Sequence, residues 1–379
     1  MKRKLLPGWL LISVLFCGSC FAVDRSLNTL MSQIGNEMTT IYPLVYAERQ
    51  LSSQELTTIT QSLEHMSHLF SQSGTQIQKR SETYQVSYDF IKSYLAETVH
   101  AFKTENLDYA RSRLYGINDI CTSCHTQDTH LRTLFKGKGR EAFKSDYVYA
   151  EFSFLTRDYQ QAEVYFDKQL RSKEHLTEYK IINPIKRLIT IYTQIYNRPG
   201  DGAMQLVKYR ALWDHSMETR DALNGWINGL NALEKNGASQ VKNPDFKTLA
   251  NYVEKYLGKI DKSTGELILP ADEEVARVWL RGQLYHYLNR NPTKNEIPQI
   301  LYWLARCDRS VGYSYNFTLV DMYLKDCVNN YPTHRFAQRC YSEYKDFVTS
   351  RYGGSGGEFT PPEIEDELFA MKRLLKHAK

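Results

Sequence analysis

Glycine and proline are scarce in this chain, with 20 and 11 residues among 379. Stretches in which polar residues alternate with β-branched apolar residues are also absent, apart from one short strand-like segment from Gly265 to Pro270. A protein built mainly from β-sheets is therefore excluded. Apolar residues instead recur every three or four positions nearly everywhere, a period that is typical of amphipathic helices. The sequence predicts an all-α fold.

Two common catalytic and nucleotide-binding motifs are absent too. The chain contains no HExxH metal motif and no phosphate loop of the GxxxxGK(S/T) kind. It also offers no acid/base pair of the kind that an enzyme such as a peroxidase needs. We therefore predict a protein that is not an enzyme in the strict sense.

A surplus of basic charge is missing. The chain has 48 Lys and Arg against 43 Asp and Glu, a formal net charge of +5, and the two signs are interspersed. Removal of residues 1–22, which carry three basic and no acidic side chains, lowers that charge to +2. Nucleic-acid-binding proteins usually carry a basic surplus or a basic stripe. The sequence therefore predicts no nucleic-acid partner.

The first 22 residues have the pattern of a secretory signal peptide. Residues 2–4 are basic, an apolar run follows at 5–16, and Ala22 is a small residue suited to cleavage. The run is too short for a stable membrane anchor, and we expect no transmembrane segment in the mature chain. A lipoprotein anchored at Cys20 is disfavoured because Cys17 stands where lipoproteins carry a large aliphatic residue. The sequence predicts an exported protein of the periplasm.

Residues 135–140, rich in glycine and lysine, divide the chain into two parts. The part before them contains helical patterns at roughly 25–48, 53–71, 81–104 and 107–130. Four helices of this length joined by short turns are typical of an up-down-up-down bundle. We predict a four-helix domain over 23–135, a second helical domain over 141–351, and a flexible linker with an amphipathic helix over 352–379.

The second domain begins with the pattern of a helical hairpin. Ala150 and Phe154 lie one turn apart on a first helix, and Ala162 and Phe166 face back from a second helix. Small residues where helices approach, with aromatic residues filling the groove, resemble a tetratricopeptide repeat. A similar rhythm returns at 317–348, whereas the pairs between the two are degenerate. An irregular helical domain without true repeats is the alternative.

The segment INDICTSCHTQD, residues 117–128, contains two cysteines three positions apart and a histidine directly after the second. A structural zinc site needs four ligands, and the cysteines farther along the chain stand alone. A thioredoxin-like dithiol requires an α/β setting, and a disulfide between residues three apart on one helix is strained. Zinc, redox and disulfide interpretations are therefore disfavoured.

Covalent attachment of a c-type haem satisfies every constraint on this segment. Cys121 and Cys124 lie on one face of a helix and can bond the two vinyl groups of the haem, and His125 can bind the iron as proximal ligand. Haem is attached to c-type cytochromes outside the cytoplasm, in agreement with the export signal. We therefore predict one haem c, with its iron, held at these three residues.

The order of the helices and the attachment site resembles the cytochrome c-prime family. The resemblance covers about residues 24–135, with the CxxCH motif near the end of the fourth helix. It implies a four-helix haem-binding bundle, and a homodimer through the bundle is possible. Two features depart from the family pattern. Asp128 and Thr129 stand where an aromatic residue and an arginine often follow the histidine, and Arg25 is only an approximate counterpart of the usual arginine on helix one.

The residue on the other face of the iron sets the chemistry. Met31 is the candidate distal metal ligand, because Ile34, Met38 and Ile41 continue one apolar stripe below it. Both methionines are alternatively core residues, and Leu27 or Asn28 would then face an open iron. Three histidines on helices two and three are weaker candidates: His65, His68 and His100.

Three cysteines remain for the second domain. Cys327 and Cys340 fall on successive helices of the last hairpin, so a disulfide between them is geometrically possible. Cys307 would then be a free thiol, which in an exported protein should be buried or paired elsewhere. Alternatively, all three are small buried apolar residues.

Together these patterns predict an exported monohaem c-type cytochrome that transfers single electrons. The tetratricopeptide-like domain would dock a protein redox partner. A five-coordinate haem protein that binds or senses nitric oxide or carbon monoxide is one alternative. A periplasmic scaffold in which the haem is merely structural is the other.

Overall fold

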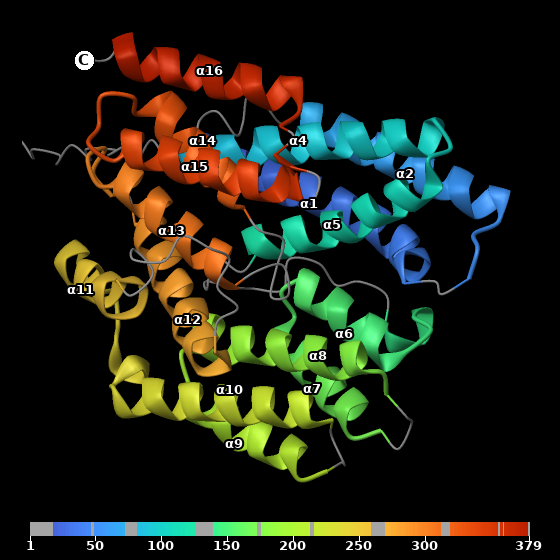
Figure 1. The fold of residues 1–379 in the computed structure, drawn as a ribbon. Coiled ribbons are helices and arrows are strands. Elements are labelled where there is room, and N and C mark those ends of the chain that lie inside the picture. The colour runs from blue at the N-terminus through green and yellow to red at the C-terminus, as the bar shows by residue number, and fades with distance from the viewer. Residues whose placement is uncertain are drawn as a thin grey trace, which may run out of the picture.

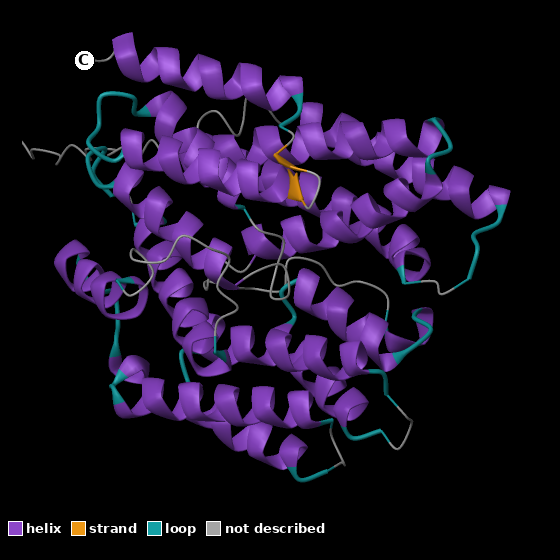
Figure 2. Ribbon diagram, viewed as in Figure 1, coloured by secondary structure: helices purple, strands orange, loops and turns teal. Residues whose placement is uncertain are grey.

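The computed structural model describes residues 18–46, 49–72, 82–125, 139–172, 176–212, 216–258, 270–290, 292–311, 319–354, 357–358 and 360–377. These residues form an all-α fold, as predicted (Figure 2). The exception is one antiparallel pair of two-residue strands, β1 (Gly353–Gly354) and β2 (Gly357–Glu358). The strand-like segment noted at 265–270 falls outside the described residues, except for Pro270.

Four helices make up the N-terminal part of the fold (Figure 1). They are α1 (Gly18–Val45), α2 (Ser53–Gln72), α4 (Glu82–Lys103) and α5 (Leu107–His125). Each packs on the next, and α1 also contacts α5. The predicted bounds agree closely, but α1 begins at Gly18, before the expected cleavage site after Ala22. Residues 126–130, expected to continue the fourth helix, lie outside the described residues.

The core of this bundle follows from the helical period of the sequence. On α1 the buried apolar residues Leu30, Ile34, Met38, Ile41 and Val45 recur every three or four positions, so that they lie on one face of the helix. Buried apolar residues of α2, α4 and α5 face the same interior. Met38 therefore serves as a core residue, whereas Met31 is half-buried at the edge of the core.

The rest of the chain is an array of shorter helices. It comprises η1 (Arg140–Ala142), α6 (Asp146–Leu155), α7 (Tyr159–Leu170), α8 (Glu178–Thr190), η2 (Ile191–Ile195), α9 (Pro199–Arg210), α10 (Met217–Lys235), η3 (Ala238–Gln240), α11 (Phe246–Leu257), α12 (Ala271–Leu288), α13 (Ile297–Val311), α14 (Val320–Asn330), α15 (Ala337–Tyr352) and α16 (Pro362–His377). Neighbouring helices pack mostly on one another in chain order. None of the helices within the described residues is long and apolar enough to cross a membrane.

The first hairpin of this array, α6 and α7, has the predicted packing. Ala150, Phe154, Ala162 and Phe166 are fully buried between the two helices, and the rings of Phe154 and Phe166 lie 6.4 Å apart. The turn is fixed by Asp158, whose side chain caps α7 by accepting a hydrogen bond from the backbone N–H of Gln161 (3.3 Å).

The helical array curves back onto the bundle at both ends. At its start, α6 contacts both α1 and α5, and near its end α14 packs on α4. In Figure 1, α6 lies next to α5, and α14 lies next to α4, with α16 packed on α14 and α15. The two predicted domains are therefore in direct contact through α6 and α14.

A buried ion pair lies at the start of the array. Glu151 of α6 and Arg187 of α8 are 0% and 5% exposed, and Arg187 Nη2 lies 3.2 Å from Glu151 Oε2. Tyr42 of α1 is fully buried beside them, and its ring lies 5.3 Å from that of Phe152. Burial and then the nearby Glu151 carboxylate raise the pKa of Tyr42 well above its usual value. Tyr42 is therefore a neutral phenol at the junction.

The last hairpin is closed by a disulfide. Cys327 of α14 and Cys340 of α15 are bonded, with Cα atoms 6.2 Å apart, so the pairing that the sequence left open is present in the structure. Cys307 is a free thiol in the buried core of α13. The C-terminal helix α16 packs on α14 and α15, with Met371 and Leu375 buried in the contact.

Candidate functional site

The CxxCH motif occupies the last turn and a half of α5, which ends at His125. Cys121 and His125 are four residues apart, and residues at this spacing lie on one face of a helix. The Cys121 side chain is half-buried against the core and is not part of a disulfide. The side chain of Cys124 lies outside the described residues.

His125 is fixed by the helical array rather than by the bundle. Its Nδ1 forms a short hydrogen bond with the backbone carbonyl of Leu155, at the end of α6. The Tyr159 hydroxyl at the start of α7 donates to the backbone carbonyl of His125, at 3.4 Å. Because a carbonyl oxygen only accepts, Nδ1 must carry the proton and donate it. The other ring nitrogen, Nε2, then keeps its lone pair.

The surroundings of His125 favour the neutral imidazole. Burial, and secondarily the positive charge of Arg157, lower the pKa of His125 to about 4. At neutral pH the ring is therefore uncharged, which is the form that binds a metal ion. The Nε atom of Arg157 is buried and has no hydrogen-bond partner within the part of the chain that the structure describes.

Arg157 owes its position to the backbone of the α6–α7 turn. Its φ is +67°, in the left-handed region that residues other than glycine rarely occupy. The turn lies between Leu155 and Tyr159. The α6–α7 hairpin therefore brings three groups to His125: the Leu155 carbonyl, the Arg157 side chain and the Tyr159 hydroxyl. These partners of His125 were not predictable from the sequence, because one is a backbone carbonyl and all of them belong to the domain predicted to be separate.

Met31 lies on the helix that runs antiparallel to α5. Tyr46, just past α1, contacts Tyr115 of α5 at 5.6 Å between ring centroids, and Arg111 donates to the carbonyl of Arg49 at 3.3 Å. Met31 precedes Tyr46 by fifteen residues, or about 22 Å along a helix, and His125 follows Tyr115 by ten, or about 15 Å. Both therefore lie toward the same end of the bundle. The side chains of Leu27 and Asn28 are outside the described residues.

The remaining histidine candidates are on the outside of the bundle. His65, His68 and His100 are all exposed. His65 Nδ1 lies 2.7 Å from Glu37 Oε1, and His68 Nε2 lies 2.8 Å from the Gln72 amide nitrogen. Their positions favour surface roles, and Met31 remains the candidate for the second axial ligand.

Comparison with models of known families, with characterised proteins and with solved structures finds no match to this chain.

Proposed function

We propose that this chain is an exported c-type cytochrome that carries one haem, bonded through Cys121 and Cys124 and ligated at the iron by His125. Bound there, the haem would supply an iron that cycles between two oxidation states and so passes single electrons. The periplasm is the compartment in which we expect this to happen, because the N-terminal pattern is that of an exported protein.

The observation that carries this proposal is the orientation of His125. Metal-binding histidines almost always donate their other ring N–H to a carbonyl or carboxylate, which fixes the tautomer and the direction of the ring. His125 makes this hydrogen bond to Leu155, and its lowered pKa keeps Nε2 unprotonated at neutral pH. The half-buried thiol of Cys121, one turn earlier on the same helix, also fits the attachment chemistry. The residues present therefore suit a c-type haem.

The helical array is the part of the chain that we expect to dock a protein redox partner. Its helices α7 and α9 are neighbours, since Asp167 Oδ1 accepts hydrogen bonds from Gln205 Nε2 at 2.7 Å and the Tyr209 hydroxyl at 2.8 Å. Both helices expose apolar side chains, namely Val164, Met204 and Val207. Exposed apolar residues of this kind often mark contact surfaces. His125, at the end of α5, is hydrogen-bonded to Leu155 and Tyr159 of this same array, so the proposed docking surface lies on the element that contacts the proposed iron ligand.

The Met31→Leu variant tests the electron-carrier function. The protein is exported to the periplasm with the cytochrome c maturation machinery, and the optical spectrum is recorded oxidised and reduced, with and without carbon monoxide. We expect the wild type to be low-spin with a methionine-to-iron charge-transfer band. Met31→Leu keeps the side-chain volume but removes the sulfur, so the band should disappear and the reduction potential should fall by on the order of 100 mV.

Met38→Leu is the matched control, because Met38 lies seven residues along the same helix and is buried in the core. It should keep the charge-transfer band. A band that survives in Met31→Leu would exclude Met31 as ligand. A wild-type spectrum that is high-spin and shifts with carbon monoxide would instead favour the gas-binding alternative.

A further inference from the structure

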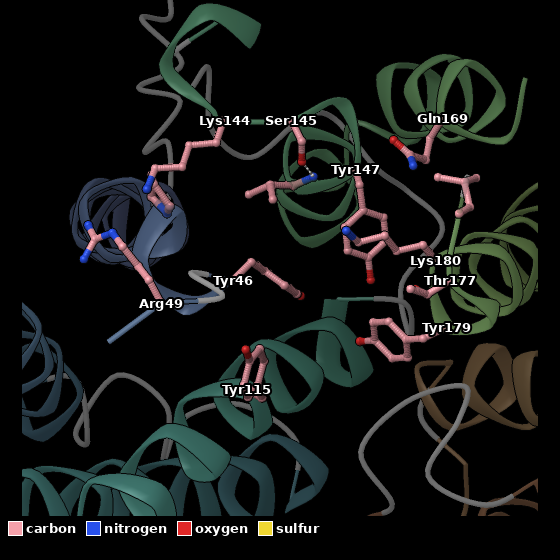
Figure 3. A pocket seen from close by; sticks show the side chains of 13 residues that line it. Tyr46, Arg49, Tyr115, Lys144, Ser145, Tyr147, Gln169, Thr177, Tyr179 and Lys180 are labelled. Atoms are coloured by element: carbon pink, nitrogen blue, oxygen red, sulfur yellow. Dashed lines mark hydrogen bonds between the residues drawn. The ribbon is translucent and has the colours of Figure 1, made fainter. Parts of the chain in front are cut away.

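A cavity of about 860 Å³ lies where the bundle meets the helical array. Figure 3 shows side chains of Tyr46, Tyr147, Tyr179 and Lys180 converging on its centre, from the end of α1, from α6 and from α8. Its volume is in the range of sites that hold small organic ligands. Tyr115, on its α5 side, precedes His125 by ten residues, about 15 Å along a helix. The cavity is therefore separate from the candidate haem site.

The charges that line this cavity are all of one sign. Three cationic side chains contribute to its wall, Arg49, Lys144 and Lys180, and none of the thirteen described lining residues is acidic. Arg49 is neutralised by Glu55, whose Oε2 lies 2.8 Å from Arg49 Nη1. Lys144 forms no ion pair within the described part of the chain. Lys144 therefore brings to the wall a positive charge without an ion-pair partner among the described residues, and Lys180 places a second cationic side chain there.

Four tyrosine rings form one continuous side of the cavity. Tyr115, Tyr46, Tyr147 and Tyr179 follow one another with ring centroids 5.6, 5.8 and 6.5 Å apart. Neighbouring rings meet edge to face, at interplanar angles of 71°, 86° and 72°, so the wall offers both ring edges and ring faces to an aromatic body. Tyr179, at the end of this row, is 58% exposed and can contact such a body directly.

A buried polar side chain and a helix terminus also face the cavity. Gln169 of α7 is only 8% exposed and is one of the residues that line the cavity, as Figure 3 shows. Its amide can both donate and accept a hydrogen bond. Thr177 precedes α8 as its N-cap and makes no side-chain capping hydrogen bond, so the first N–H groups of this helix remain available beside the cavity.

The geometry points to a binding site for a small organic anion with an aromatic body. The tyrosine wall would cover the ring system, while Lys144, Lys180 and the start of α8 would meet the negative group. The Gln169 amide would supply the remaining hydrogen bond. This site does not depend on the haem, and nothing in the proposed electron transfer uses it.

Titration calorimetry of the mature full-length chain tests this site with two dyes. The anionic probe is 8-anilinonaphthalene-1-sulfonate, and the neutral probe is N-phenyl-1-naphthylamine, which has the same ring system without the sulfonate. We expect one site that prefers the anion. The Lys144→Gln/Lys180→Gln double variant should weaken the anionic dye by about tenfold or more, because hydrogen bonds to charged groups are among the strongest, and should leave the neutral dye unchanged.

Lys247→Gln on α11 is the matched control, because this lysine is exposed and does not line the cavity. It should bind both dyes as the wild type does. A second variant, Gln169→Leu, should weaken the anionic dye severalfold, and circular dichroism of every variant checks that it is folded. The proposal is overturned if the double variant binds the anion as tightly as Lys247→Gln does, or if it loses both dyes equally.

Discussion

A chain in which Cys121 and Cys124 are both replaced by alanine is expected to carry no covalent haem after export. In the proposed site each thiol would supply one of the two bonds to the haem, so removal of both would leave no covalent link that survives denaturation. The measurement is haem staining of a denaturing gel, on which the double variant should fall below detection. A single Cys121→Ala variant keeps one bond and should retain a weaker band.

Cys307→Ala is the matched control for this experiment, because Cys307 is a free thiol outside the CxxCH motif and lies buried on α13. It should stain like the wild type. A double variant that stains as strongly as Cys307→Ala would mean that the haem is held elsewhere. If the double variant still folds and binds its protein partner with normal affinity, the scaffold alternative gains support instead.

The Glu151→Ala variant is expected to lose about 3–5 kcal/mol of unfolding free energy, the usual cost of removing one partner of a buried ion pair. Arg187 is 5% exposed and would be left with its charge buried beside Tyr42. Urea denaturation followed by circular dichroism measures the effect. The loss of unfolding free energy should be seen at neutral pH. Because Glu151 lies outside the CxxCH segment, that segment is intact in the variant.

Two further variants separate the buried charge from the loss of a contact. In the Glu151→Leu/Arg187→Leu double variant both charges are gone, so most of the stability should return. Asp201→Ala breaks an exposed pair with Arg198, whose side chains are 42% and 58% exposed, and should cost less than about 1 kcal/mol. Equal losses in Glu151→Ala and Asp201→Ala would contradict the account of the junction.

The helices of this chain were predictable because a helix depends on the spacing of apolar residues within its own segment. The three- and four-residue spacing of apolar residues predicted α2, α4 and the start of α5 to within one residue. The α6–α7 hairpin was also predictable from local sequence, because Ala150 and Ala162 are small residues at the positions where the two helices approach closely. Neither feature required knowledge of distant parts of the chain.

The contacts between the two parts could not be predicted in the same way. The partner of His125 is the Leu155 carbonyl, and a backbone atom leaves no trace in the choice of residue. The cavity is built from residues between Pro43 and Lys180 that are far apart in the chain, and its tyrosines look like ordinary packing residues in the sequence. The hydrogen bond of His125 and the cavity both depend on how α6 packs on the bundle. The amino-acid pattern of either domain alone does not determine that packing.

The cysteines show an intermediate case. The spacing of Cys327 and Cys340 on successive helices allowed a disulfide without requiring one, because sequence separation does not determine which faces of the helices meet. The structure brings the two together and leaves Cys307 buried and free. The packing of α14 on α15 therefore decides between the two alternatives, a disulfide or separate buried cysteines, in favour of the disulfide.

The proposed function depends on a haem held by Cys121 and Cys124. The most direct test is the intact mass of the wild-type chain exported with the maturation machinery, together with its pyridine haemochrome spectrum after extraction with acidified organic solvent. We predict the mass of the mature chain plus one haem, and a haemochrome band typical of two thioether bonds that stays with the polypeptide. A chain of unmodified mass whose colour is lost to the solvent would contradict the account.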